Sequence, residues 1–182
     1  LWLRLIPMLT MGSTDILNVV GSDDPLYNLR QVEQVLHNFP GYAWFDAMTH
    51  FPTGDFIYWG PLFTYILAIA CMVSGAATRP EIIGATLLVP PIMATILIPI
   101  MYYVGRSCGD WKTGLFASGF TAIVSGQYFY RSFYGYLDHH IAEVFFATIF
   151  CLIYIHALQT GKEHAVDFTK TETLRKPALL SI

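Results

Sequence analysis

Charged residues are scarce in this sequence: they make up 13% of its 182 residues, about half of the share in a typical soluble domain. Hydrophobic residues make up 54%, and the mean hydropathy is +0.49. The formal net charge is only −3 and there is no basic stripe, which argues against nucleic acid as a partner. The three cysteines lie far apart, so they form neither a zinc-binding spacing nor an even set of disulfides. The composition predicts a membrane protein.

Three long apolar runs predict helices that cross the membrane, because roughly 20 apolar residues in a helix cover the hydrocarbon core. They are Ile82 to Val104, Thr113 to Tyr130 and Ile141 to Leu158. The pair Pro90-Pro91 predicts a kink in the first run. We therefore expect an all-α fold, a polytopic bundle of membrane helices.

The apolar run from Leu62 to Ser74 is shorter, and its length is typical of a re-entrant or interfacial helix. If it does not cross the membrane, two crossings separate Asp24 from Asp138, and both lie on the same face. Positive charge gathers in cytoplasmic segments, and the basic residues that would then be cytoplasmic are Arg106, Lys112, Lys162, Lys170, Arg175 and Lys176. We expect a multi-pass protein of the cell membrane with both aspartates on the external face.

This topology divides the chain into four segments. They are the end of a first membrane helix (1–6), a first external loop (7–81), three membrane helices (82–160) and a cytoplasmic segment (161–182). An external loop over 131–140 lies between the second and the third of these membrane helices. The first loop is expected to be ordered. Asp24-Pro25 is a typical helix start, and apolar spacing predicts an amphipathic helix over 25–38. Because the chain opens without methionine in a run too short to cross a membrane, we expect a fragment of a larger protein.

Two acidic motifs lie next to these apolar segments, one around Asp23 and Asp24 and one ending in Asp138-His139-His140. Carboxylates and imidazoles are costly near hydrocarbon, so their presence there indicates a functional site. Asp-x-His is a suitable pair of ligands for Mg²⁺ or Mn²⁺. The spacing alone does not decide between Asp23 and Asp24.

Each of these residues also has a structural interpretation. Asp24 before proline is an ordinary helix cap, and a cap uses only one carboxylate oxygen. Asp138 could likewise cap the next helix, and His139 would point elsewhere if the segment were extended. Glu143 could accept the other N–H of the His140 imidazole, or it could be a solvated charge.

Arg131 could extend its charge to the membrane interface, or it could be a fixed cation that orients a carboxylate or holds an anionic substrate group. Four further polar residues are interpreted as solvated loop residues without a chemical role. They are His37, Asp46, His50 and Asp55.

Three blocks of the sequence resemble the catalytic subunit of archaeal N-linked oligosaccharyltransferases. Asp24 to Arg30 is similar to the family's Asp-Pro-Tyr-Tyr/Phe-x-x-Arg signature, and Trp44 to Leu62 is similar to its Trp-Phe-Asp, Tyr-Pro-x-Gly and Pro-Gly-Leu block. Arg131 to His140 is similar to the loop Arg-x-x-x-Gly-x-Tyr-Asp-x-(Asp/Glu/His), of which Asp-His-His is the archaeal version. The blocks come in the family's order and cover residues 1–160.

The resemblance implies a fold of the glycosyltransferase C type, with the first external loop crossing over the active site. It implies that Asp24, Asp138 and His140 bind Mn²⁺ or Mg²⁺ and that Arg131 neighbours Asp24. The implied reaction is the inverting transfer of an oligosaccharide from dolichol phosphate or pyrophosphate to asparagine in Asn-x-Ser/Thr. The implied partners are the lipid-linked oligosaccharide, the acceptor polypeptide and the membrane.

The sequence also departs from the family. Leu137 stands where the family has an aromatic residue, and neither the later external-loop glutamate nor the Trp-Trp-Asp-x-Gly motif that reads the acceptor lies in this sequence, so we expect the fragment alone to be inactive. One alternative is another glycosyltransferase that uses dolichyl-phosphate sugars, such as a protein O-mannosyltransferase, but the paired Asp-Glu of that family's first loop is missing here. The other alternative is a transporter, which would hold charges in the middle of its helices.

Overall fold

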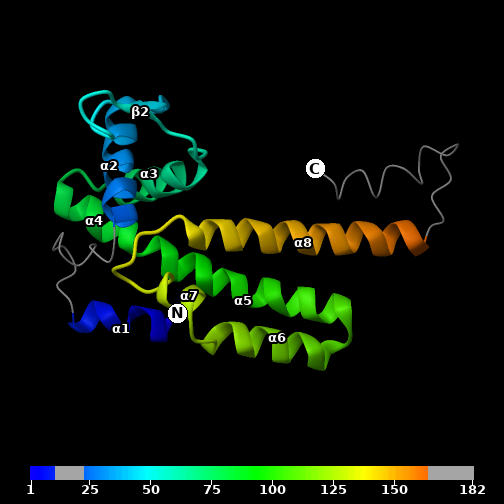
Figure 1. Cartoon of the computed structure of the whole chain (residues 1–182). Coiled ribbons are helices and arrows are strands. Elements are labelled where there is room, and N and C mark those ends of the chain that lie inside the picture. The colour runs from blue at the N-terminus through cyan, green and yellow to red at the C-terminus, as the bar shows by residue number, and fades with distance from the viewer. Residues whose placement is uncertain (11–22, 164–182) are drawn as a thin grey trace, which may run out of the picture. The chain divides into compact units, whose positions relative to one another are not determined.

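The computed structural model describes residues 1–10 and 23–163 (Figure 1). Most of these residues are helical, as predicted, and the described part of the chain also contains a single two-stranded sheet. The helices are α1 (Trp2–Thr10), α2 (Asp23–Asn38), α3 (Leu62–Ser74), α4 (Arg79–Leu87), α5 (Val89–Cys108), α6 (Trp111–Ile123), α7 (Gln127–Tyr130) and α8 (His140–Glu163), and the strands are β1 (Phe45–Asp46) and β2 (Asp55–Phe56). The chain forms two compact units, one of Leu1–Met93 with Gly126–Ala142 and one of Ala94–Ser125 with the residues from Glu143 onward.

Helices α2, α3 and α4 build the core of the first unit, and Figure 1 shows α2 lying beside the other two. The buried apolar side chains are Leu29, Val32 and Val35 from α2, Phe63, Leu67, Ala68 and Cys71 from α3, and Ile82, Ile83 and Leu87 from α4. The three residues from α2 are the middle of the apolar stripe expected for a helix over 25–38, because positions three and four apart share one face of a helix. This packing fixes α2, which begins with Asp23 and Asp24.

The segment between α2 and α3 is a hairpin in which β1 and β2 pair antiparallel, with Phe45 opposite Phe56 and Asp46 opposite Asp55. The rings of Phe45 and Phe56 meet edge to face with centroids 5.3 Å apart. The first loop is therefore ordered around these strands. α3 contains the 13 residues of the short apolar run and ends where Gly75 takes a φ of 71°, a left-handed conformation that glycine adopts without strain.

The first long apolar run is interrupted at Leu88, between α4 and α5. The break comes just before Pro90-Pro91, whose nitrogens carry no hydrogen for bonding to the preceding turn. The prolines were expected to kink the helix here, and the structure shows the interruption two residues earlier. Taken together, Arg79–Cys108 is still long and apolar enough to cross a membrane. Within the described residues, His140–Gly161 is the second helix that meets this criterion.

The predicted continuous helix over Thr113 to Tyr130 is wrong. α6 ends at Ile123, after 13 residues, because Val124 leaves the helical region with ψ of 122° and Gly126 takes a φ of 114°. The chain then forms the short helix α7. At about 1.5 Å per residue, α6 is roughly 20 Å long, less than the hydrocarbon core of a bilayer.

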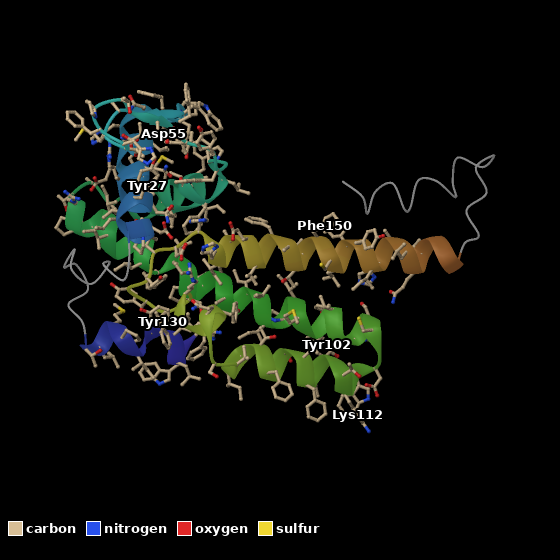
Figure 2. All side chains as sticks on the ribbon, viewed as in Figure 1. Tyr27, Asp55, Tyr102, Lys112, Tyr130 and Phe150 are labelled. Carbon is tan, nitrogen blue, oxygen red and sulfur yellow. The ribbon has the colours of Figure 1, made fainter. Side chains whose placement is uncertain are left out.

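Close helix packing in the second unit depends on glycine. A Cβ atom at Gly114 would lie 2.7 Å from the carbonyl oxygen of Tyr102, and one at Gly105 would lie 2.8 Å from the Cβ of Ala117. These contacts bring α5 and α6 together, and Figure 2 labels Tyr102 and Lys112 on the two helices. The side chain of Gln159 in α8 donates to the Ser107 carbonyl at 2.7 Å, at the end of α5.

Candidate active site

The residue at the centre of the predicted site, Asp138, lies in the loop between α7 and α8 and is fully buried. Its Oδ1 accepts a hydrogen bond of 3.3 Å from the backbone N–H of His140, the first residue of α8. A contact of this kind is typical of a residue that caps a helix. Asp138 can therefore cap α8 and take part in a functional site at the same time, since Oδ1 contacts the helix and Oδ2 does not.

Arg131 faces that second oxygen. Its Nη1 forms an ion pair with Oδ2 of Asp138, and its Nε donates to Oε1 of Gln127 at 3.1 Å. The guanidinium also lies 5.8 Å from the centre of the Tyr136 ring. Arg131 is therefore turned toward a carboxylate of the predicted site, and that carboxylate belongs to Asp138.

Two imidazoles lie beside the Asp138 carboxylate. One ligand atom each from Asp138, His139 and His140 lies within 4.8 Å of the others. The Nδ1 of His139 is 3.2 Å from Oδ1 of Asp138, and the two imidazole rings have centroids 4.5 Å apart. His139 was expected to point elsewhere only if the segment were extended, and residue 139 instead lies in the turn that leads into α8.

Among the described residues, the other predicted site residues are not members of this group of possible ligands. Asp24 is exposed in the first turn of α2, and it is not part of the group of possible ligands among the described residues. The side chain of Asp23, the alternative ligand, lies outside the described residues. Glu143 follows His140 by one turn of α8 and is exposed.

The loop that carries Asp138 is held by Arg4, which sequence analysis did not single out. Arg4 is 1% exposed, its Nε donates to Oγ of Ser132 at 2.9 Å, and its carbonyl oxygen accepts from the N–H of Tyr134 at 2.9 Å. The guanidinium lies over the rings of Tyr128 and Phe129, at 5.3 and 4.8 Å from their centroids. A single arginine inside an apolar run was the available signal, since such a charge needs partners.

Asp46 was expected to be solvated, and that expectation is wrong. It is 4% exposed and accepts from Arg30 at 2.5 Å, from the Met48 N–H at 2.9 Å and from the Thr49 hydroxyl at 3.1 Å. Burial raises the pKa of the Asp46 carboxyl, but the Met48 amide, the Thr49 hydroxyl and the Arg30 guanidinium together hold it below its ordinary value. His37 and His50 are exposed, as predicted.

The group around Asp138 fits a divalent cation. Ligands bound at about 2.0–2.3 Å from one ion lie at most about 4.6 Å apart, so donor atoms within 4.8 Å need only a small adjustment. A carboxylate with imidazoles suits Mn²⁺ or Zn²⁺, whereas Mg²⁺ prefers oxygen ligands.

A family model described as Oligosaccharyl transferase STT3, N-terminal, matches residues 12–174. The chain belongs to the STT3 family. It is 31% identical over 159 residues to the dolichyl-phosphooligosaccharide-protein glycotransferase 3 of Archaeoglobus fulgidus, covering 87% of this chain and 18% of that protein. The chain therefore spans about a fifth of the length of this STT3 relative.

Two solved structures of STT3 relatives resemble the fold. The archaeal oligosaccharyltransferase AglB from Archaeoglobus fulgidus, in complex with an inhibitory peptide and a dolichol-phosphate, superposes with a TM-score of 0.80 at 29% identity, over 88% of this chain and 19% of that one. The Archaeoglobus fulgidus oligosaccharyltransferase in complex with Zn and sulfate gives a TM-score of 0.74 at 27% identity, over 92% of this chain and 22% of that one. The fold of this chain is that of the corresponding part of these enzymes.

Proposed function

We propose that the protein containing this chain transfers an oligosaccharide from a dolichol phosphate or pyrophosphate to the asparagine of Asn-x-Ser/Thr, with inversion and with a requirement for a divalent cation. Membership of the STT3 family supports the reaction class, and an STT3 relative bound to a peptide and a dolichol-phosphate supports the two partners. In the reaction, the asparagine nitrogen would form a bond to the anomeric carbon as that carbon's bond to the phosphate oxygen breaks. The lipid phosphate or pyrophosphate would leave, and the nitrogen would release one proton to solvent. Direct displacement of this kind inverts the anomeric carbon.

The observation that carries the proposal is a fully buried carboxylate, Asp138, placed between an arginine and two histidines. We assign Asp138 and His140 as ligands of Mn²⁺ or Mg²⁺ and add Asp24 from α2. A relative solved in complex with Zn and sulfate supports the binding of a divalent cation. When bound, the cation would offset the charge that develops on the phosphate leaving group.

The residues of this chain would prepare the site. Arg131 holds one oxygen of Asp138 and places a positive charge beside the loop, where it can attract an anionic substrate group. Asp24, exposed at the start of α2, can also accept a hydrogen bond from the acceptor carboxamide. Glu143 would accept the N–H of His140 and so orient the imidazole.

We assign the site to the external face of the cell membrane in a multi-pass protein, with α3 lying at the membrane surface or re-entering it. In a cysteine-free full-length protein, Met48→Cys and Tyr130→Cys should both react with an impermeant reagent in intact cells, since both side chains are exposed, at 64% and 53%. Lys112→Cys should react only after the cells are opened. Labelling of one of the first two without the other would place the two acidic motifs on opposite faces and contradict the shared site.

The decisive experiment is a metal titration of glycopeptide formation in membranes stripped with a chelator, using the full-length protein. Activity should disappear on chelation and return with Mn²⁺. Asp24→Ala and Asp138→Ala should each weaken the apparent metal affinity. A rate that chelation leaves unchanged, or two variants with wild-type metal affinity, would show that these residues are helix caps only.

A further inference from the structure

One face of α2 carries two buried amide side chains, Asn28 and Gln31, each 2% exposed. They lie three residues apart, so they are neighbours on the helix surface. Buried amides need hydrogen-bond partners. Asn28 bonds to the loop that carries Asp138, and Gln31 bonds to Trp59, whose ring lies against that loop.

The first contact holds the residue before Asp138. The Nδ2 of Asn28 donates to the carbonyl oxygen of Leu137 at 3.2 Å, and Leu137 is itself fully buried. This hydrogen bond joins residues 109 positions apart in the sequence. It fixes the backbone next to Asp138 against α2, whose first turn contains Asp24.

The second contact holds the residue after Asp138. The Trp59 ring stacks on the His139 imidazole with planes 1° apart and centroids at 6.1 Å. The indole N–H of Trp59 donates to Oε1 of Gln31 at 3.4 Å. The same oxygen accepts from Thr64 at 3.2 Å and from Tyr42 at 3.4 Å, so three donors fix which end of the Gln31 amide faces Trp59.

The amide nitrogen of Gln31 indicates that stabilising the fold is not the main role of the contacts between Gln31 and Trp59. Within the described residues, Nε2 of Gln31 is buried and has no hydrogen-bond partner. Burying an unsatisfied donor costs about 1–3 kcal/mol. Gln31 is therefore better explained as the acceptor that orients Trp59 than as a residue selected for its own packing.

We propose that Asn28 and Trp59 are positioning residues that clamp Asp138 through its two neighbours in the sequence, Leu137 and His139. The clamp rests on the proposed function, because its purpose is to hold the Asp138 carboxylate and the adjacent imidazoles in a geometry that binds a divalent cation. Neither residue supplies a ligand. Partners that orient metal ligands typically contribute 10–100-fold to metal affinity.

The test compares Asn28→Ala and Trp59→Leu with two matched controls in the purified full-length protein. Asn38→Ala removes an amide that also donates to a backbone carbonyl, that of Gln34 at 3.0 Å, but within α2. Trp44→Leu removes an indole that is 54% exposed and meets the Tyr42 ring. Mn²⁺ affinity is measured from the electron paramagnetic resonance signal of free Mn²⁺, and hydrogen exchange of residues 131–140 is measured without metal.

Both clamp variants should bind Mn²⁺ about 10–100-fold more weakly and exchange faster over 131–140, while both controls match the wild type. Trp59→Phe, which keeps an aromatic ring against His139, should lie closer to the wild type than Trp59→Leu. Equal Mn²⁺ affinity in clamp variants and controls would overturn the proposal. Equal Mn²⁺ affinity in the wild type and in Asp138→Ala would instead overturn the proposed metal site. In that case, unchanged hydrogen exchange over 131–140 in Asn28→Ala and Trp59→Leu would separately overturn the clamp.

Discussion

Two aspartates of the first unit are buried beside an arginine, one in the hairpin and one in the loop before α8. Asp46 is 4% exposed and faces Arg30, and Asp138 is fully buried and faces Arg131. A buried pair of this kind is often interpreted as a functional site, because unpaired charge is costly away from water. By that criterion alone the two aspartates would be equivalent.

Their remaining neighbours separate them. Both carboxylates accept from a backbone N–H, and the further donor to Asp46 is the Thr49 hydroxyl. Asp138 has the imidazole of His139 beside it and that of His140 close by, and a neutral imidazole nitrogen can bind a cation. Burial and an arginine therefore identify an organised carboxylate, whereas the chemistry of its other neighbours indicates whether it can bind a metal.

The largest expected difference between Asp138 and Asp46 should appear when each carboxylate is removed in turn from the full-length enzyme. Asp138→Ala should lower the rate of glycopeptide formation by roughly 10²–10³-fold, as expected when a group that stabilises developing charge is lost. Asp46→Ala should reduce the amount of folded protein and leave the rate per folded molecule near the wild type. Similar losses of rate per folded molecule in the two variants would make Asp46 part of the site.

A second test changes the neighbour of Asp138 and not Asp138 itself. His140→Asp replaces a borderline nitrogen ligand with a hard oxygen, so activity should persist and the metal preference should move toward Mg²⁺. Titrations with Mn²⁺ and Mg²⁺ in chelator-stripped membranes measure the ratio of the two affinities. A ratio that does not change would argue that His140 is not a ligand.

A third test measures the structural role of Asp46. Asp46→Asn removes the ion pair with Arg30 and weakens the hydrogen bonds from Met48 and Thr49, at a cost of about 1–3 kcal/mol in the free energy of unfolding. Asp55→Asn is the control, because Asp55 lies opposite in the hairpin and its pair with His50 is more open to solvent. The thermal unfolding midpoint should fall more for Asp46→Asn, and a larger fall for Asp55→Asn would contradict this account.

The smallest expected effect is a dependence of stability on pH. Because the folded-state pKa of Asp46 is lowered from 3.8, its contribution is fully present above that value and is lost as the pH falls through the folded pKa. The difference in unfolding midpoint between the wild type and Asp46→Asn should therefore be constant above pH 5 and shrink below about pH 4. A difference that stays constant down to pH 3 would mean that the Asp46 charge does not stabilise the fold.

Sequence patterns predicted the local features well where one element decides them. The apolar stripe of α2 and the helix over Leu62–Ser74 follow from spacing. The kink predicted from Pro90-Pro91 corresponds to the interruption at Leu88. The motif ending in Asp138-His139-His140 brought the possible ligands together because they are adjacent in the chain. The break after Ile123 was missed, because a run of apolar residues outweighed the Ser125-Gly126 pair.

Composition and motifs were sufficient for the helical class and the family, and they predicted Asp24, Asp138 and His140 as ligands of a metal. Three features became visible in the folded chain alone: Asp46 is buried, Arg4 holds the loop through Ser132 and Tyr134, and Asn28 donates to Leu137. These features depend on contacts between residues that are remote in the chain. Periodicity and composition indicate which face of a segment is buried and which is exposed to solvent. They do not indicate which distant polar group will pair with a buried donor or charge.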